Sequence, residues 1–471
     1  MSHNLLKINF LIAHLVVMGI WSIQNADGQK NYLAIHTGIP WFDQNNNTVN
    51  AHGACIVKEG EKYYLFGEYK SDTANVFTGF SCYSSTDLMN WKFEKMVLPL
   101  QKDGLLGPNR VGERVKVMKC PETGEFVMYM HADDRKYMDP HIGYATCKTI
   151  DGDYQFQGAL LYNGEPIRKW DMGTFQDTDG TGYLLIHHGM IYELSADYKS
   201  AKRIVVSQIP TGESPTIFKS NGMYFWLSSH LTSWERNDNF YMTANSLEGP
   251  WKMRGTFAPK GTLTWNSQCS FVLPITNGKE TLFMYMGDRW SYPLQGAAAT
   301  YVWQPIRVKG DSISIPDFWG SWKVDFINTK AKEFEINEES VKTNCIIVKG
   351  NWKLTGGLLV SKEKGATIAC SFTGVQVGIK AISNNTSGYA RVIIWNSKNK
   401  EIINTLVDFY SKYEYSSMKF LSPMMKKDQY TISIEVLGKH GVWSNKAKDT
   451  FGSTDDFVII EDIYKVVQDK Q

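Results

Sequence analysis

A polar turn centred on glycine, followed by a strand rich in aromatic and aliphatic residues, recurs five times along the chain. The turn glycines are Gly60, Gly124, Gly180, Gly222 and Gly278. A further apolar strand follows each copy, and helical periodicity is nearly absent. All-strand units of this size are typical of four-stranded propeller blades. The pattern therefore predicts an all-β fold with a five-bladed β-propeller, and an array of β-sandwiches is the alternative.

The pattern changes after the segment "FWGSWKVDF" at residues 318–326. From about residue 335, segments such as "GATIACSFTGVQVGIKAI" and "QYTISIEVLG" alternate apolar and polar residues with a period of two. Such alternation is typical of strands with one buried face. We therefore expect a propeller domain over residues 29–326, followed by a C-terminal β-sandwich over residues 335–471.

The first residues have the organisation of an export signal. Lys7 precedes the apolar segment "INFLIAHLVVMGIW", and the polar segment "SIQNADG" follows it. This order predicts a signal peptide over residues 1–28 and export to the periplasm or the extracellular space. The alternative is an N-terminal helix buried in the core. No later segment is long and apolar enough to suggest a stable membrane span.

Composition narrows the class of partner. Aromatic residues make up 13% of the chain, while the formal net charge is only +2. Aromatic rings suit β-rich structure and also stack on the C–H faces of sugars. A net charge this small produces no strong field, so neither nucleic acid nor a polyanionic substrate is expected.

The seven cysteines lie far apart, with no CxxC pair and no histidine cluster at zinc spacing. Most are expected to be small buried residues, and a Cys345–Cys370 disulfide remains open. The segment "DTDGTG" at 177–182 resembles the start of a calcium loop but lacks the later ligands, so a hairpin turn is expected there. We expect no required cofactor and no metal site; a structural calcium is not indicated.

Polar residues open the first strand of several repeats. Glu113, Asp171, Glu213 and Gln268 begin otherwise apolar strands in the second to fifth repeats, and the first repeat offers His52 and, one strand later, Glu68. Because the innermost strands of a propeller surround one axis, these side chains are expected to meet in one pocket. Three acids and an amide suit glycoside hydrolysis, in which one acid protonates the leaving oxygen and a base activates water.

An ordered set of motifs resembles glycoside hydrolase family 43, and within it the exo-β-1,3-galactanase-like subgroup, subfamily 24. The motifs read "AHGA", "YYLFGE", "ERVKV", "HADD", "DMGTFQDTDGTGY", "GESP", "SQCSFVLP" and "GDRW", and the resemblance covers roughly residues 33–326. It implies a five-bladed propeller and an inverting glycosidase. The C-terminal part looks more loosely like a β-sandwich appended to such enzymes, often carbohydrate-binding.

The resemblance also implies roles for single residues. Glu213 would be the general acid, Asp171 would modulate its pKa, and Gln268 would position the attacking water in place of the usual aspartate base. Glu113 is the alternative base, or a substrate ligand. The residues implied in substrate binding are Glu68, His52, Tyr137, Trp234, Asn237, Asp288 and Trp290. The sequence departs from the subgroup at Gly212, which replaces an arginine before the acid, and this puts the linkage in doubt more than the reaction.

We therefore expect a secreted exo-acting glycosidase that acts on a polysaccharide or oligosaccharide and removes β-1,3-linked galactose with inversion. Galactan and arabinogalactan backbones are the expected substrates. A second hypothesis keeps the fold but changes the sugar to arabinofuranose, galactofuranose or xylose. A third is a sugar-binding propeller without catalysis, which the missing aspartate favours and the retained acids oppose.

Overall fold

The computed structural model describes residues 31–445 and 448–467, so the predicted signal peptide at 1–28 lies outside the described residues. Within the described part, α-helix is limited to two segments of four residues, α1 (Leu263–Asn266) and α2 (Gln295–Ala298). Two 3-10 turns lie at Gly104–Leu106 and Lys342–Asn344. The predicted all-β fold is confirmed.

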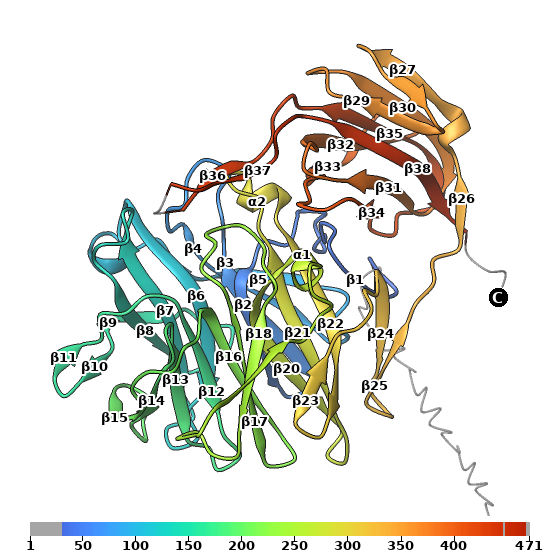
Figure 1. The fold of residues 1–471 in the computed structure, drawn as a ribbon. Coiled ribbons are helices and arrows are strands. Elements are labelled where there is room, and N and C mark those ends of the chain that lie inside the picture. Colours follow the sequence, from blue (N-terminus) through green and yellow to red (C-terminus); the bar gives the residue numbers. More distant parts are fainter. Residues whose placement is uncertain (1–30, 446–447, 468–471) are drawn as a thin grey trace, which may run out of the picture.

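Residues 52–314 form five sheets that follow one another in chain order, and the four main strands of each sheet are antiparallel (Figure 1). The first holds β2 (His52–Glu59), β3 (Lys62–Glu68), β4 (Gly79–Ser85) and β5 (Lys92–Pro99). The second holds β6 (Arg110–Lys119), β7 (Phe126–Asp134), β8 (His141–Cys147) and β9 (Gln155–Ala159). The third holds β12 (Met172–Gln176), β13 (Gly182–Ile186), β14 (Met190–Leu194) and β15 (Ala201–Val206), with the short strands β10 (Leu161–Tyr162) and β11 (Glu165–Pro166) at its edge.

The fourth sheet holds β16 (Glu213–Ser220), β17 (Met223–Ser229), β18 (Phe240–Ala244) and β19 (Lys252–Thr256). The fifth holds β20 (Gln268–Thr276), β21 (Thr281–Arg289), β22 (Thr300–Lys309) and β23 (Ser312–Ser314). The first strands of the five sheets contact one another in a closed ring. The order around the ring is β2, β6, β12, β16, β20 and back to β2.

The five turn glycines identified in the sequence lie between the first and second strands of these five sheets. All five have positive φ, from 60° at Gly60 to 88° at Gly278. Residues with a Cβ rarely adopt this backbone region, which explains why glycine recurs there. The segment at 177–182 is such a turn, because Asp177 and Gly180 close it with backbone hydrogen bonds.

A three-stranded sheet joins the beginning of the described chain to the end of the fifth repeat. It consists of β1 (Ile35–His36), β24 (Ser321–Asp325) and β25 (Lys330–Glu333). In the order of pairing, β24 lies between the other two strands. The beginning of the described chain therefore pairs directly with the segment that follows the fifth sheet.

The C-terminal residues form two further sheets. One contains β28 (Lys353–Thr355), β29 (Leu358–Ser361), β38 (Val458–Val466), β31 (Val377–Ser383) and β34 (Tyr415–Leu421), and β26 (Glu338–Ser340) also pairs with β38. The other contains β27 (Cys345–Lys349), β30 (Thr367–Gly374), β35 (Asp428–Val436), β32 (Tyr389–Asn396) and β33 (Glu401–Asp408). A separate hairpin is formed by β36 (Val442–Ser444) and β37 (Thr450–Gly452).

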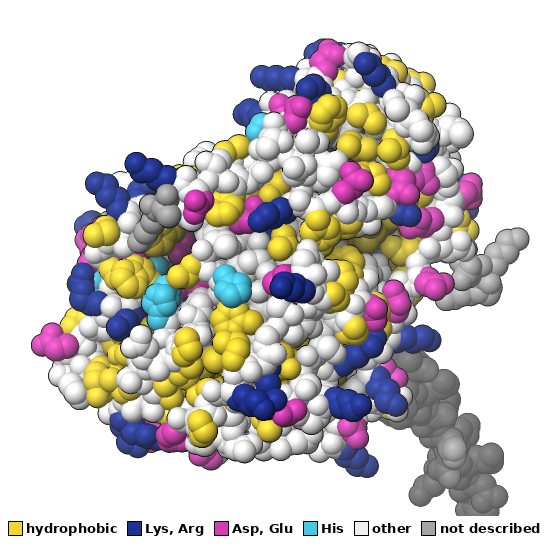
Figure 2. Space-filling model, viewed as in Figure 1, with side chains coloured by type: hydrophobic (Ala, Val, Ile, Leu, Met, Phe, Trp, Pro, Cys, Tyr) yellow, Lys and Arg dark blue, Asp and Glu magenta, His cyan; other side chains and the backbone are white. Residues whose placement is uncertain are grey.

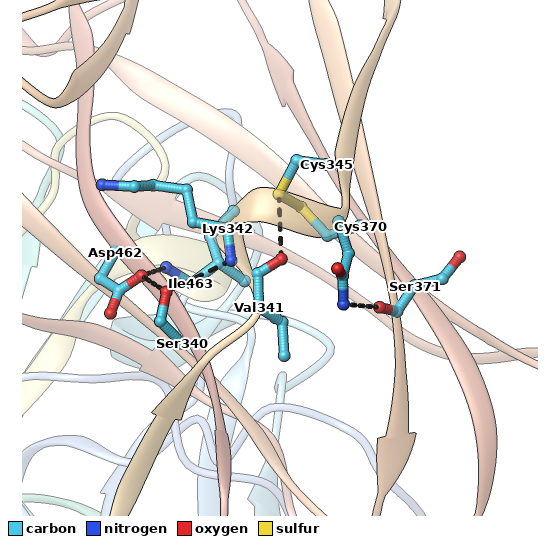
Figure 3. The surroundings of a disulfide bond; sticks show 9 residues. Ser340, Val341, Lys342, Cys345, Cys370, Ser371, Asp462 and Ile463 are labelled. Carbon is cyan, nitrogen blue, oxygen red and sulfur yellow. Dashed lines mark hydrogen bonds between the residues drawn. A yellow bond between two sulfur atoms is a disulfide. The ribbon is translucent and has the colours of Figure 1, made fainter.

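A disulfide joins Cys345 and Cys370, on neighbouring strands β27 and β30 (Figure 3). This pairing was left open by the sequence and is present in the structure. The C-terminal sheets and the first and fifth sheets share one continuous cluster of buried apolar side chains. Phe42, near the start of the described chain, contacts Phe420 of β34 across this cluster, with ring centroids 6.1 Å apart. The exact domain boundaries remain a prediction.

Candidate active site

The first strands of four sheets contain a β-bulge close to their N-terminal ends. The pairing register shifts between His52 and Cys55, between Glu113 and Lys116, between Glu213 and Thr216, and between Cys269 and Phe271. A bulge bends the strand and redirects its side chains. Gly53, Arg114 and Ser214 lie in these bulges with φ of 57–58°. For Arg114 and Ser214 this backbone region is strained, and such strain persists only where the surroundings hold it.

The polar residues at these strand ends line one pocket with a volume of about 750 Å³. Eight residues singled out from the sequence line it: Glu68, Glu113, Tyr137, Asp171, Glu213, Trp234, Gln268 and Trp290. The structure thus brings together all four residues predicted to act in catalysis, although strands of four separate sheets supply them. Pockets that combine aromatic walls with convergent polar groups are the usual form of a small-ligand site.

Glu213 is a half-buried acid with a neutral partner. Its Oε1 accepts a hydrogen bond of 2.8 Å from Nε2 of Gln268. Burial and the nearby charge of Asp171 raise the pKa of Glu213 to about 8, against the opposing effect of the Arg114 charge. At neutral pH the carboxyl group therefore carries a proton that it can donate.

Asp171 is held by ionic and backbone contacts. Its Oδ1 lies 2.9 Å from Nε of Arg114, and its Oδ2 accepts a hydrogen bond of 2.7 Å from the backbone N–H of Ser214. Ser214 directly follows Glu213, so Asp171 is fixed beside the strand that carries the acid. The arginine keeps a negative charge stable close to Glu213.

Gln268 uses its whole amide group in hydrogen bonds. Its Oε1 accepts from Arg114 at 2.7 Å and from Trp290 Nε1 at 2.8 Å. Its Nε2 donates to Glu213 and to Ser229 Oγ, the latter at 3.0 Å. The role that the resemblance implies for this amide, positioning the attacking water, would place it across the sugar from Glu213. In the structure Gln268 is instead bonded directly to Glu213, because β20 neighbours β16.

Glu113 lies in a polar and positively charged environment. Its Oε1 accepts hydrogen bonds from Asn75 at 2.9 Å and from Tyr137 at 3.0 Å, and its Oε2 lies 3.4 Å from Nδ1 of His131. Burial alone would raise the pKa of Glu113, but the His131 hydrogen bond and the Lys70 charge lower it well below the usual range. At neutral pH Glu113 is therefore ionised.

His131 is the positive partner of this carboxylate. Its Nε2 lies 3.1 Å from Asp133 Oδ2. Burial would lower the pKa of His131, but the bonds to Asp133 and Glu113 raise it to about 9. The imidazole is therefore a cation at neutral pH, and it stabilises the negative charge of Glu113.

Two tryptophans and a lysine form an aromatic part of the pocket wall. The rings of Trp234 and Trp290 meet edge to face at 5.1 Å. Lys70 Nζ lies 5.3 Å from the Trp234 ring centre and 2.5 Å from Glu68 Oε2. Indole faces of this kind can stack on the apolar face of a sugar ring while the carboxylates bind its hydroxyl groups.

Three residues implied in substrate binding do not line the pocket: His52, Asn237 and Asp288. His52 lies 3.4 Å from Asp288 and stacks on Tyr301, while Asp288 also accepts a hydrogen bond from the backbone of Gly53. Asn237 bonds both to the backbone of His230 and to Thr232. These contacts support the backbone around the pocket, and direct binding by these three residues remains a prediction.

Sequence reasoning did not single out several other lining residues: Arg114, His131, Lys136, Trp170, His187, His188, Leu231, Ser233, Ser444 and Asn445. Two signals were available. Arg114 directly follows Glu113, and His131 opens the "HADD" segment. No pattern indicates Ser444 and Asn445, which come from the C-terminal hairpin.

Within residues 31–445 and 448–467, no three His, Cys, Asp or Glu side chains are grouped so that they could hold a metal ion. Among the same residues no helix is long and apolar enough to span a membrane. On the face shown in Figure 2, positively and negatively charged side chains are interspersed.

Comparison with known proteins places this geometry in a family. The family model for glycosyl hydrolases family 43 matches residues 47–260. No curated protein matches the chain. A crystal structure from Bifidobacterium bifidum s17, of a protein described as an exo-β-1,3-galactanase, is 37% identical, with a TM-score of 0.56; the match covers 59% of this chain and 95% of that chain.

Two further crystal structures match over most of the chain. An exo-β-1,3-galactanase from Phanerochaete chrysosporium, crystallised with β-1,3-galactotriose, is 26% identical with a TM-score of 0.67, and the match covers 92% of this chain and 99% of that one. An exo-β-1,3-galactanase from Clostridium thermocellum, 24% identical with a TM-score of 0.58 over 82% and 99% of the two chains, shares the fold. The chain is a glycoside hydrolase and belongs to glycosyl hydrolases family 43.

Proposed function

We propose that the protein is a secreted, exo-acting glycosidase that hydrolyses β-1,3-linked galactose from galactan or arabinogalactan backbones with inversion. The names of two similar proteins support the substrate: both are described as exo-β-1,3-galactanases, and one was crystallised with β-1,3-galactotriose. The predicted signal peptide supports secretion to the periplasm or the extracellular space.

The fold in this proposal is a five-bladed β-propeller followed by a C-terminal β-sandwich. Five consecutive sheets, each with four antiparallel main strands, support the propeller, and so do the contacts of their first strands in a ring. The two C-terminal sheets around a shared apolar cluster support the sandwich. The propeller would place the pocket at one end of its axis.

The observation that carries the proposal is the contrast between two half-buried carboxyl groups in one pocket. Glu213 is protonated at neutral pH, while Glu113 is ionised. An inverting glycosidase needs one carboxyl group in each state, with room for a water between the sugar and the base. Since β6 and β16 are not neighbours in the ring of first strands, the two groups approach the pocket from separate sides.

In the proposed reaction, Glu213 transfers its proton to the glycosidic oxygen as the bond from that oxygen to the anomeric carbon breaks. Glu113 takes a proton from a water molecule, and the water oxygen forms the new bond on the opposite face of the sugar. The product is α-galactose, and Glu213 ends ionised while Glu113 ends protonated. Exchange with water restores both groups, and no cofactor takes part.

Gln268 and Asp171 act in this scheme through Glu213. The amide of Gln268 bonds to the carboxyl group and fixes its orientation, and desolvation together with the charge of Asp171 keeps it protonated. Glu113 replaces Gln268 as the proposed base because a carboxylate accepts a proton far more readily than a fully hydrogen-bonded amide. The aromatic wall of Trp234 and Trp290 would hold the terminal sugar.

The test is hydrolysis by the full-length protein of β-1,3-galactotriose and of aryl glycosides of galactose, arabinofuranose, galactofuranose and xylose. We expect galactose release, with α-galactose as the first product in proton NMR spectra. Preferential release of another monosaccharide would contradict the galactan substrate, and β-galactose as first product would contradict inversion. Binding without any release would contradict catalysis.

A further inference from the structure

The C-terminal region contacts both segments that carry the pocket tryptophans. Tyr410 donates a hydrogen bond of 2.7 Å to Oε2 of Glu235, next to Trp234. Ser291, next to Trp290, donates a hydrogen bond of 2.8 Å to Oδ2 of Asp408. Glu235 is buried, so these are internal contacts and not surface pairs. Both aromatic residues of the wall are thus one residue away from a contact with the C-terminal sheets.

Arg236 lies at the centre of this junction and is 1% exposed. Its guanidinium donates to the backbone carbonyl of Trp290 and lies 3.9 Å from Oδ2 of Asp408. It also lies 5.2 Å from the ring centre of Tyr410 and 6.0 Å from that of Trp443. An arginine within reach of two aromatic rings is attracted to them by cation–π interaction, which is stronger where water is excluded.

The hairpin of β36 and β37 continues from this junction to the pocket. Figure 1 shows it extending from the C-terminal sheets over the ring of the first five sheets, close to α2. Ser444 and Asn445, at the end of β36, line the pocket together with Glu213 and Gln268. Asn445 holds the hairpin end, because its side chain bonds to Asp449 through both its oxygen and its nitrogen.

We propose that the C-terminal region completes the substrate site, with Ser444 at the hairpin end contacting a sugar beyond the terminal galactose. This inference rests on the proposed function. Ser444 is exposed whereas Gln268 is buried, so the hairpin forms the outer rim and the acids form the floor. A terminal sugar at the floor leaves the next sugar of the chain at the rim. The Arg236 junction positions the hairpin and the two tryptophans relative to each other.

The rim contact is tested with Ser444→Trp, which adds bulk at an exposed position where folding is not threatened. We expect KM for β-1,3-galactotriose to rise about tenfold or more. KM for an aryl β-galactoside, which has no second sugar, should change little. The matched control is Val442→Trp, because Val442 lies on the same strand, is also exposed and does not line the pocket. The control should behave as the wild type on both substrates.

Each outcome decides the inference. Equal KM values for Ser444→Trp and the wild type on galactotriose would overturn it. Equal increases on both substrates would overturn the assignment to a sugar beyond the terminal one. If the wild type releases no galactose from galactotriose, the proposed function has failed, and a rim contact can still be measured by calorimetric titration of galactotriose into both variants.

The junction is tested with Tyr410→Phe, which removes the hydroxyl bonded to Glu235 but keeps the ring beside Arg236. We expect KM to rise severalfold on both substrates with kcat nearly unchanged, because the wall is displaced and the acids are not. A lower Tm with unchanged KM would reduce Tyr410 to a structural contact and overturn its positioning role.

Discussion

Two regions of the pocket shift the pKa of a half-buried glutamate in opposite directions. Glu213 is bonded to a neutral amide and lies near the negative charge of Asp171, whereas the charged groups beside Glu113 are a cationic histidine and Lys70. Both carboxyl groups are half-buried, yet the pKa of Glu213 is raised to about 8 and that of Glu113 is lowered. Burial alone therefore does not set the protonation state, and the sign of the neighbouring charges decides between acid and base.

The largest effect is expected from a substitution of Glu213, the acid in this contrast. Glu213→Gln keeps the shape of the side chain but removes the proton donor, so hydrolysis of β-1,3-galactotriose should slow by about 10²–10⁴-fold. Aryl galactosides should lose less, since their leaving groups need little protonation. Steady-state rates measure both. Glu193→Gln is the control, because Glu193 is paired with Lys202 and Arg203 away from the pocket; an equal loss there would refute the assignment.

The second-largest effect is expected from a substitution of Glu113, the proposed base. Glu113→Gln should reduce the rate on an activated aryl galactoside by about 10²-fold or more, because no anion remains to take the proton from water. Azide needs no deprotonation, so it should restore the rate and give α-galactosyl azide. Product NMR identifies the azide. If azide has no effect and only KM rises, Glu113 binds substrate and the base must be sought at Gln268, where Gln268→Ala would then abolish turnover.

A smaller effect, a shift in the pH dependence of activity, is expected from a substitution of Asp171. In the wild type, kcat/KM should fall as the pH rises through about 8, where Glu213 loses its proton. Asp171→Asn removes a charge that raises this pKa and frees the positive charge of Arg114, which lowers it. The basic limb of the profile should therefore move to lower pH. Asp177→Asn, in a hairpin away from the pocket, should leave the limb in place; a profile that only decreases in height would make Asp171 a substrate ligand.

The smallest effect is on stability. A carboxyl group with a pKa raised from 4.5 to about 8 in the folded state stabilises the protein below the unfolded value and loses that contribution as the pH rises through the folded value. Glu213→Gln has no such dependence. The Tm of Glu213→Gln should therefore rise relative to that of the wild type as the pH increases from about 4.5 to 8. Calorimetry at a series of pH values measures this difference. A constant difference in Tm would show that Glu213 is not the titrating group.

Much of this arrangement could be predicted because it depends on repetition. The turn glycines and the polar residue at the start of each first strand are local features, and equivalent positions in equivalent strands meet at one place. Glu113, Asp171, Glu213 and Gln268 were found in this way.

What could not be predicted depends on backbone detail and on distant contacts. The bulge that turns Arg114 toward Asp171 and Gln268 leaves no trace in the apolar pattern, so a central charge of the site was missed. His52 and Asp288 matched family motifs, but the structure pairs them with each other outside the pocket lining. Ser444 lies far along the chain from the residues it joins, and no local signal indicates that proximity.

The pairing of β1 with β24 has a consequence for biosynthesis. His36 of β1 and Ser321 of β24 are hydrogen-bonded although 285 residues separate them. During synthesis, β1 therefore leaves the ribosome long before its partner strand is made. Early sheets can form as they emerge, but the strand contact between β20 and β2 needs nearly the whole region to be translated. The pocket, which draws on β3, β6, β16 and β20, thus matures only when synthesis is almost finished.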